Sequence, residues 1–416
     1  MQKLYVYADF DWLDAPQLLG ELSCDSVRGN ETYGFSYNKE WLAEYGDVFL
    51  SEDLQRYPGI QYTKPERDIF ACFSDSFPDR WGRTLLNRRE QIAAKDEKRA
   101  VRRLTSFDYL MGIDDASRMG GFRFAETLGG AFINSEDSLR VPPLANVREL
   151  MQAAHKIEAS EEKHLLPSKK WLAQLLHPGT SLGGARPKAS VMDEKGNLTV
   201  AKFPSRKDDY DVTRWEHFCH VMGRKSGIKA AETRTIPGED YHILLSKRFD
   251  RTKDGKRIHF ASALTLLGLT DGDNASTGYG YPDIVDFIIR RGGKVEQDLE
   301  EIYRRVAFFI IVGNSDDHFR NHGFLLTRKG WELSPAYDIN PTLADNQSLL
   351  INRSTSGSDL NILLESAGDY MLSDERAKRI IDEVKSAMKS WRREARKLAL
   401  PQRDIDTFAP RFDKWL

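Results

Sequence analysis

The chain is 416 residues long, which is enough for two or three domains with substantial hydrophobic cores. Its 61 Lys and Arg residues nearly balance its 63 Asp and Glu residues, and the net charge of -2 argues against a protein built mainly to coat nucleic acid. Three widely separated cysteines argue against structural zinc and against a disulfide framework.

The same features indicate a cytoplasmic protein. Few cysteines fit a reducing compartment. The opening residues Met1–Tyr7 lack the apolar core of a signal peptide. The longest apolar runs are much shorter than the roughly 20 residues that a membrane helix needs, so we expect no membrane partner.

Residues 1–140 are predicted to form an N-terminal α+β subdomain. Tyr33–Tyr37 alternates aromatic residues at strand period. From Asp68 the pattern turns helical, with a charged helix expected through Arg103. The pair Pro142-Pro143 then closes the subdomain.

Residues 145–250 are predicted to form the first of two lobes. After a helical stretch from 145 to 177, a Gly-rich segment leads into a β-hairpin that carries Lys202 on its second strand. Glycines let backbone amides approach phosphates, and a strand lysine reaches phosphate oxygens. Taken alone, the same residues also fit a flexible lead-in to a hairpin with an exposed lysine.

A helix predicted over 214–222 carries Glu216, a candidate partner for Lys202. In kinases a helix glutamate positions the strand lysine in this way, although a solvated Glu is the alternative. The stretch 241–250 is typical of a buried strand that ends in a turn, where a hinge between lobes would lie.

Residues 251–416 are predicted to form a mainly helical second lobe. Its central feature is the polar segment 313–322, which follows the apolar run 306–312 and precedes a hairpin over 323–333. A polar loop held between buried elements can keep catalytic groups rigid. A charged amphipathic helix is expected over 374–400.

The polar segment has the spacing of a kinase catalytic loop. Asp316 and Asn321 lie five positions apart, as do the kinase Asp that takes the substrate hydroxyl proton and the Asn that binds magnesium. After the hairpin, Asp338 is expected to return near this loop as a second metal ligand. The alternative is that Asp316 and Asn321 cap a helix and that Asp338 lies in a turn before Pro341.

The order of these parts predicts a bilobal kinase. Loop amides and Lys202 would hold the triphosphate, Asn321 and Asp338 would hold magnesium, and Asp316 would accept or orient the hydroxyl proton. We expect these groups to share one cleft between two lobes.

The motifs depart from those of ordinary eukaryotic kinases, because Ser315–His318 replaces His-Arg-Asp and Tyr337–Asn340 replaces Asp-Phe-Gly. In this the chain resembles the HipA family of bacterial serine/threonine kinase toxins. The resemblance is carried by four stretches, which are Ser181–Lys188, Lys247–Arg251, Asn314–Asn321 and Ser334–Asp338. Residues 73–83 and 120–124 also resemble that family's N-terminal subdomain.

The resemblance implies a two-lobed protein-kinase-like fold, related to the phosphatidylinositol 3/4-kinase-like group and preceded by a small α+β subdomain. It implies that ATP and Mg²⁺ are the cofactors, that Asp316 is the catalytic aspartate and that Asn321 and Asp338 bind the metal. The residues it places at ATP are Ser181, Gly183, Gly184, Ala185, Lys188, Lys202, Lys247, Phe249, His318 and Arg320.

The resemblance also implies regulation and partners. Family members autophosphorylate a serine of the Gly-rich loop, which corresponds to Ser181, and the added charge would expel that loop from a phosphate site. The typical partner is a small helix-turn-helix antitoxin, HipB-like, through which DNA is contacted only indirectly. Known members phosphorylate aminoacyl-tRNA synthetases. Two alternatives stay open: a catalytically silent co-repressor, and a kinase that acts on a small molecule or a lipid.

Overall fold

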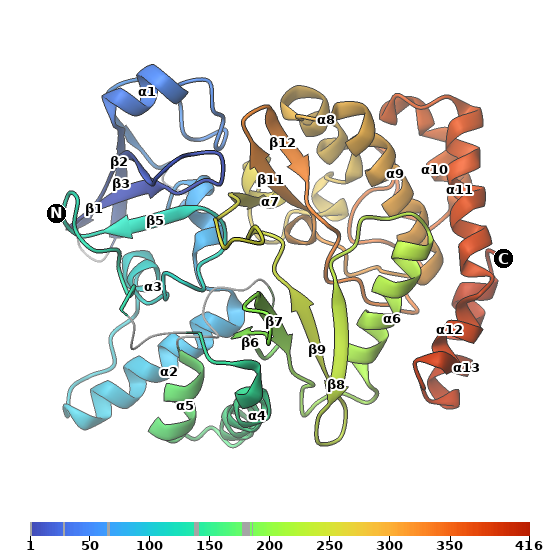
Figure 1. The fold of residues 1–416 in the computed structure, drawn as a ribbon, viewed down its shortest axis with the longest axis horizontal. Coiled ribbons are helices and arrows are strands. Elements are labelled where there is room, and N and C mark those ends of the chain that lie inside the picture. Colours follow the sequence, from blue (N-terminus) through green and yellow to red (C-terminus); the bar gives the residue numbers. More distant parts are fainter. Residues whose placement is uncertain (1, 28–29, 65–66, 137–140, 177–183, 185) are drawn as a thin grey trace. The chain divides into compact units, whose positions relative to one another are not determined.

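The computed structural model describes residues 2–27, 30–64, 67–136, 141–176, 184 and 186–416. The chain divides into two compact units (Figure 1), one of residues 1–208 with 245–261 and the other of residues 209–244 with 262–416. The chain passes from one unit to the other three times: after Asp208, within β9 (His242–Lys247) and within β10 (Phe260–Ser262). The domain boundaries predicted at residues 140 and 250 stay predictions.

The first unit contains a five-stranded antiparallel sheet in the order β4-β3-β2-β1-β5. Its strands are β1 (Gln2–Ala8), β2 (Gln17–Val27), β3 (Asn30–Tyr37), β4 (Ile60–Tyr62) and β5 (Phe122–Ala125). Alternate residues of a strand point to one face, and in β1 that face buries Leu4, Val6 and Ala8 completely. The strand predicted at Tyr33–Tyr37 is confirmed.

The two long helical stretches that the sequence predicts in the first unit are each broken. They are α1 (Lys39–Tyr45), η1 (Ala71–Ser76), α2 (Arg80–Asp96), α3 (Ser106–Met111), η3 (Leu144–Asn146), α4 (Val147–Glu162) and α5 (Lys169–Leu176). The prediction of helix from Asp68 through Arg103 is wrong as a continuous element, because Pro78 keeps Phe77 extended at ψ 163° and a new helix begins after its N-cap, Asp79. The stretch 145–177 likewise contains two helices, with Pro167 between them.

The hairpin that was predicted to carry Lys202 is confirmed. Strands β6 (Lys188–Met192) and β7 (Leu198–Lys202) are antiparallel, and Lys188 lies directly opposite Lys202. Residue Arg248, which follows β9, donates its backbone N–H to the Leu198 carbonyl at 2.9 Å. Lys202 therefore ends a strand that is hydrogen-bonded on both sides.

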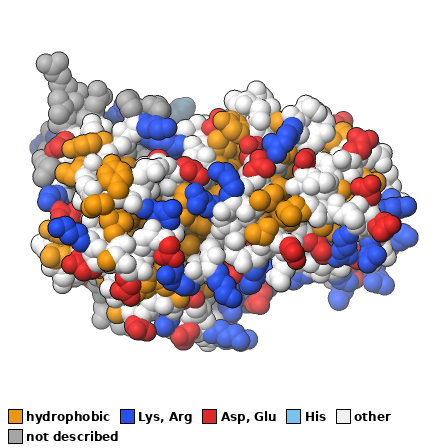
Figure 2. Space-filling view, turned by 90° about the horizontal axis from the view of Figure 1, so that it is seen from above, with side chains coloured by type: hydrophobic (Ala, Val, Ile, Leu, Met, Phe, Trp, Pro, Cys, Tyr) orange, Lys and Arg blue, Asp and Glu red, His pale blue; other side chains and the backbone are white. Residues whose placement is uncertain are grey.

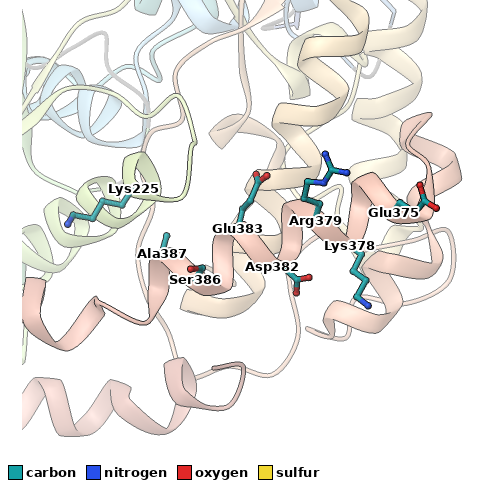
Figure 3. A pocket seen from close by; sticks show the side chains of 8 residues that line it. All are labelled: Lys225, Glu375, Lys378, Arg379, Asp382, Glu383, Ser386 and Ala387. Carbon is teal, nitrogen blue, oxygen red and sulfur yellow. The ribbon is translucent and has the colours of Figure 1, made fainter.

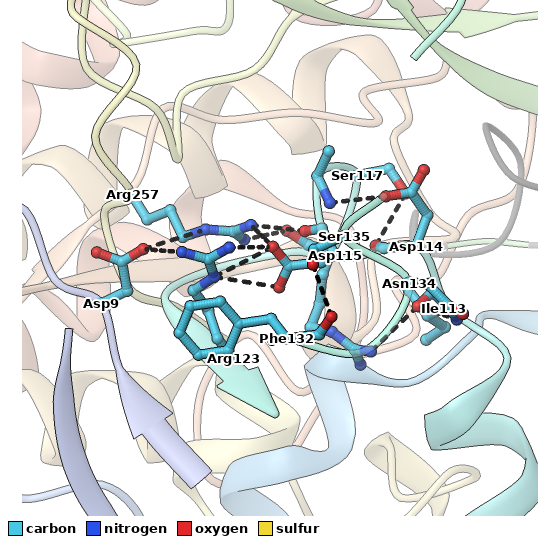
Figure 4. A network of polar contacts seen from close by, with 12 residues as sticks. Asp9, Ile113, Asp114, Asp115, Ser117, Arg123, Phe132, Asn134, Ser135 and Arg257 are labelled. Atoms are coloured by element: carbon cyan, nitrogen blue, oxygen red, sulfur yellow. Dashed lines mark hydrogen bonds and ion pairs between the residues drawn. The ribbon is translucent and has the colours of Figure 1, made fainter. Parts of the chain in front are cut away.

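A buried network of charges stabilises the first unit beside its sheet (Figure 4). The Asp115 carboxylate accepts from Arg123 Nη2 at 2.5 Å and from Arg257 Nη2 at 3.1 Å, and both arginines also lie within 4 Å of Asp9. Burial alone would raise the pKa of Asp115, but the two arginines outweigh it and lower that pKa. Asp115 is therefore charged and paired in the folded protein.

The neighbouring Asp114 is also buried, but no arginine pairs with its carboxyl among the described contacts, and its pKa is raised instead of lowered. It is 2% exposed, and its Oδ2 has no hydrogen-bond partner among the residues that the structure describes. Its Oδ1 accepts the backbone N–H of Ala116 at 2.7 Å. Burial raises the pKa of this carboxyl to about 6, and the Asp115 charge adds to the effect.

We expect Asp114→Asn to stabilise the protein at neutral pH by roughly 2–3 kcal/mol. The folded state binds this proton more tightly than the unfolded state, so the penalty for ionising Asp114 grows as pH rises from about 4 to about 6 and then stays constant. Asparagine keeps the shape and carries no such penalty. Urea unfolding of the parent and of Asp114→Asn at pH 7.5 and at pH 4 measures the free energy of unfolding. The stabilisation by Asp114→Asn should disappear at pH 4.

The matched control is Asp115→Asn. Folding lowers the pKa of Asp115, whereas it raises that of Asp114, so removing the Asp115 charge should destabilise the protein at pH 7.5. Equal effects of the two substitutions at pH 7.5 would contradict this assignment.

The second unit is mainly helical. Its elements are α6 (Val212–Lys225), β8 (Thr233–Pro237), α7 (Ala263–Leu266), η4 (Ala275–Thr277), α8 (Tyr281–Arg291), α9 (Val295–Val312), η5 (Phe319–Asn321), β11 (Gly323–Thr327), β12 (Gly330–Leu333), α10 (Leu360–Glu365), η6 (Ala367–Tyr370), α11 (Asp374–Met388), α12 (Trp391–Lys397) and α13 (Gln402–Asp413). The apolar run 306–312 forms the last two turns of α9 and is fully or almost fully buried.

The helix predicted over 374–400 is two helices, and a third follows. The break after α11 allows Trp391 to pack edge-on against Phe412 of α13, with ring centroids 4.9 Å apart, and to donate its indole N–H to Asp413. Acidic and basic side chains are interspersed on the face drawn in Figure 2, in keeping with the balanced charge. Among the described helices, none has the length and apolar character needed to cross a membrane.

Candidate active site

The polar segment of the second unit begins where α9 ends. Gly313 closes the helix in the left-handed region at φ 70°, and a Cβ at this position would lie 2.4 Å from the Thr342 carbonyl oxygen and 2.8 Å from Arg411 Nε. Only glycine fits both the conformation and the space. The buried helix therefore delivers the following residues at a fixed point.

Internal hydrogen bonds shape the loop that follows. Asn321 Nδ2 donates to the Asp316 carbonyl oxygen at 3.2 Å, and the Asn321 backbone N–H donates to the His318 carbonyl oxygen at 2.8 Å. The Ser315 carbonyl accepts both the backbone N–H and the hydroxyl of Ser348, at 2.9 and 2.7 Å. The catalytic and metal-binding residues predicted in this segment are thus brought together.

Asp338 returns to the same loop after the β11–β12 hairpin. The Asn340 backbone N–H donates to Asn314 Oδ1 at 2.9 Å, which joins the two segments, and Asn340 Nδ2 donates to Asp338 Oδ1 at 3.3 Å. Asp338 has φ 55°, a conformation that residues other than glycine rarely adopt.

The electrostatics of Asp316 reflect this crowding. Its side chain is exposed, yet nearby protein atoms displace enough water to raise the pKa of its carboxyl. His318 acts in the opposite direction, while the carboxylates of Asp338 and Asp317 raise the pKa further. A basic carboxylate at the surface is suited to accept a proton from an incoming hydroxyl group.

The donor set fits a magnesium ion. Mg²⁺ prefers hard oxygen ligands and is commonly held by one or two side chains together with substrate phosphates and water. The Asn321 side chain is held by its Nδ2 bond to the Asp316 carbonyl, so its Oδ1 is the atom that could bind a cation, and Asp338 could add a carboxylate. No group of three or more His, Cys, Asp and Glu residues suited to a metal occurs in the described part of the chain.

The first unit places several of the predicted ATP residues together. Lys188 and Lys202 are cross-strand neighbours on the β6–β7 hairpin. Lys188 Nζ lies 2.7 Å from Asp79 Oδ2, and a Cβ on Gly184 would come within 3.0 Å of that Nζ. Gly184 itself has φ 106°, in the region that favours glycine. Ser181, Gly183 and Ala185 lie outside the described residues.

The other predicted residues have identifiable surroundings. Phe249 packs against Phe260 with ring centroids 6.0 Å apart, and Lys247 is the last residue of β9. Buried Glu216 lies 3.8 Å from His220 Nε2 in α6. The pairing of Glu216 with Lys202 stays a prediction.

Two further predicted residues belong to the catalytic loop. Arg320 forms a bidentate ion pair with Asp271, at 2.7 and 3.0 Å. His318 precedes the η5 turn, and its Nδ1 is buried with no hydrogen-bond partner within the described residues. Their contact with ATP stays a prediction.

Sequence reasoning missed several supporting residues. Arg411 of α13 donates from Nη2 to the Ile310 carbonyl at 3.2 Å, so a distant helix holds the end of α9. Asp79 was also missed, although its place before a helical pattern is a capping signal. Asp317 is buried between Tyr281 and His322, and nothing in its spacing indicated that arrangement.

A surface groove lies elsewhere in the second unit (Figure 3). It runs along α11 and contains none of the catalytic-loop residues. Its lining carries both charges and consists of Lys225, Glu375, Lys378, Arg379, Asp382, Glu383, Ser386 and Ala387. Mixed charge of this kind identifies no ligand.

Comparison with known proteins gives a family and a fold. Residues 180–391, just over half of the chain, match a family described as "HipA-like C-terminal domain". A solved structure from Shewanella oneidensis, a complex of the toxin–antitoxin proteins HipA and HipB with operator DNA, has a TM-score of 0.65 and 15% identity and covers 99% of this chain and 96% of that chain. The fold is therefore that of HipA, which confirms the mixed, kinase-like architecture predicted from the sequence.

Similarity in sequence is more limited. The serine/threonine-protein kinase toxin HipA of Shewanella oneidensis is 21% identical over 348 residues, 77% of this chain and 72% of that protein. A protein of Haemophilus influenzae that is named as a kinase is 24% identical over 39% of this chain and 52% of its own length. A protein of Sinorhizobium fredii that is also named as a kinase is 24% identical over 43% of this chain and 46% of its own length. The match spans about half the length of these two curated relatives.

Proposed function

Because this chain belongs to the HipA family, we propose that it is a serine/threonine protein kinase that uses ATP and Mg²⁺ and serves as the toxin of a toxin–antitoxin pair. The proposal depends above all on one observation: Asp316, Asn321 and Asp338 are held in one loop system by hydrogen bonds between Asn321 and Asp316 and between Asn340 and Asn314. A phosphoryl transfer site needs this combination of a base and oxygen ligands, because its catalysis is mostly positioning and charge neutralisation.

Each residue has a distinct role in the proposed reaction. An Asp316 Oδ atom accepts or orients the proton of the attacking serine hydroxyl, and the raised pKa of its carboxyl makes it a better acceptor. Asn321 Oδ1 and the Asp338 carboxylate hold the metal. A bound Mg²⁺ would neutralise charge on the phosphate oxygens.

The first unit contributes the phosphate-binding residues in this proposal. Lys202 and the Gly-rich segment with Gly184 bind phosphate oxygens, while Lys188 and Lys202 form one basic pair on the hairpin. Autophosphorylation of Ser181 would place about two negative charges in that segment and switch the kinase off.

Partners follow from the same family. The similar solved structure contains HipB and operator DNA, and we propose a small HipB-like helix-turn-helix antitoxin as the partner of this chain. DNA would be reached only through that antitoxin. The substrate is a protein serine or threonine, with a translation component such as an aminoacyl-tRNA synthetase as the first candidate.

The proposal is tested by incubating the protein with γ-labelled ATP and magnesium, alone and with cell lysate, and mapping the label by mass spectrometry. We expect label on Ser181 and on a lysate protein, and no label when magnesium is removed by a chelator. A protein that binds a HipB-like antitoxin but neither binds nor cleaves Mg·ATP would be a silent co-repressor instead. Label confined to a small molecule would identify a small-molecule kinase.

A further inference from the structure

The residue next to the proposed base is a buried carboxylate with two strong hydrogen bonds. Asp317 is 1% exposed, and its Oδ2 accepts from the Tyr281 hydroxyl at 2.7 Å and from His322 Nε2 at 2.7 Å. Tyr281 begins α8 and is fully buried, and His322 immediately precedes β11 and is 1% exposed. One carboxylate therefore joins the loop, a helix and a strand.

The direction of both bonds is fixed by chemistry. An ionised carboxylate only accepts hydrogen bonds, so the tyrosine hydroxyl and the imidazole Nε2–H must both donate. Burial, with the Asp317 charge beside it, raises the pKa of Tyr281, so its hydroxyl keeps its proton. The His322 ring also packs edge-on against the Tyr281 ring, with centroids 5.6 Å apart.

Asp317, Tyr281 and His322, here called the triad, include the sequence neighbours of the proposed base and metal ligand. Asp317 directly follows Asp316, and His322 directly follows Asn321. The Asp317–His322 bond thus closes the loop at the neighbours of the proposed base and metal ligand, alongside the bond from Asn321 Nδ2 to the Asp316 carbonyl. The His322 carbonyl accepts the Ala263 backbone N–H at 2.7 Å, which anchors the closed loop to the start of α7.

We propose that Asp317, held by Tyr281 and His322, is the positioning residue that fixes the distance between Asp316 and Asn321. The inference rests on the proposed function, because it assigns a role within that catalytic loop. A rigid loop keeps base and metal ligand in register before substrate arrives, and a displacement of about 1 Å costs on the order of 10²-fold in rate.

Two substitutions weaken the triad by different amounts. Tyr281→Phe removes one donor and is expected to lower kcat about 10-fold. Asp317→Asn replaces the charged oxygen that accepts both hydrogen bonds with a neutral amide, which weakens both bonds, and is expected to lower kcat about 100-fold. Both should raise the magnesium concentration needed for half-maximal rate, because Asn321 is no longer held in place. The KM for ATP should change less than kcat.

The controls remove comparable buried groups elsewhere in the second unit. Tyr303 is fully buried and donates to the Leu363 carbonyl at 3.4 Å, and Asp298 is 2% exposed and accepts the Leu333 backbone N–H at 3.0 Å. Tyr303→Phe should lower the melting temperature, and Asp298→Asn should raise it at neutral pH because burial raises the pKa of that carboxyl. Neither substitution should change kcat or the magnesium dependence. This contrast separates positioning from a general change in stability.

A second readout does not depend on activity. Hydrogen–deuterium exchange of residues 313–322 should accelerate in Tyr281→Phe and Asp317→Asn, but not in the two controls. If the unsubstituted protein transferred no phosphate but exchange was still faster in the two variants, Asp317 would still be the residue that keeps this loop rigid. The proposed kinase function would then be refuted. Unchanged exchange, or kcat values that fall equally in triad variants and controls, would overturn the positioning role.

Discussion

Replacing Asp316 by asparagine is expected to lower the rate of phosphate transfer about 10³-fold while leaving the protein folded. Asparagine has the same shape but cannot accept the hydroxyl proton. The bond that Asn321 Nδ2 makes to residue 316 is to its backbone carbonyl, so the substitution leaves this cross-link of the loop intact. Loss of activity would then report the carboxylate and not a change in the loop.

The measurement is transfer of labelled phosphate at saturating Mg·ATP, together with calorimetric titration of Mg·ATP binding. We expect binding to stay within a few-fold of the parent, because the carboxylate acts mainly on the attacking hydroxyl in the transition state. Asp286→Asn is a suitable control, since Asp286 is a partly exposed residue of α8 that pairs with Arg353. An Asp316→Asn protein with more than a tenth of the parent activity would contradict the assignment.

The same carboxylate predicts the acid side of the pH profile. Its raised pKa means that kcat/KM should begin to fall, as pH decreases, at a higher pH than for an ordinary aspartate. The residual activity of Asp316→Asn should lack that decline.

The sequence predicted those parts of this site that depend on residues close to one another in the chain. The unbroken apolar run 306–312 predicted a buried element before the polar loop, which is the end of α9. The turn at Arg328-Lys329-Gly330 between two short strands predicted the β11–β12 hairpin. Once that hairpin was assumed, the return of Asp338 to the loop followed from its length. The order of these elements along the chain favoured a kinase architecture.

What the sequence did not reveal depends on contacts between distant segments. Arg411 lies about a hundred residues after the carbonyl of Ile310 that it contacts, and no periodicity links the two. The sequence did not distinguish Asp317 and His322 from the other polar residues of the loop, yet both are almost fully buried. Tyr281 of α8 is hydrogen-bonded to Asp317 and packs edge-on against the His322 ring. Helix ends were missed for a related reason, since the break at Trp391 is set by packing against Phe412.

The left-handed backbone of Asp338 allows its charge to be tested separately from its conformation. At φ 55°, asparagine is tolerated well because its short polar side chain can bond locally, whereas alanine costs roughly 1–2 kcal/mol. Asp338→Asn should therefore keep the stability of the parent, and Asp338→Ala should not. Both remove a carboxylate from the proposed metal site.

We expect Asp338→Asn to reduce phosphate transfer about 10³-fold and to abolish the magnesium-dependent part of the thermal shift caused by ATP. A neutral amide oxygen is a much weaker ligand for Mg²⁺ than a carboxylate, so the metal would no longer be held against the phosphates. Met371→Asn is the matched control, because Met371 is exposed, has φ 56° and lies outside the site. If Asp338→Asn retained the magnesium-dependent shift while Asp338→Ala lost it, the backbone conformation and not the charge would be what the site requires, and Asp338 would have to be replaced as the proposed ligand.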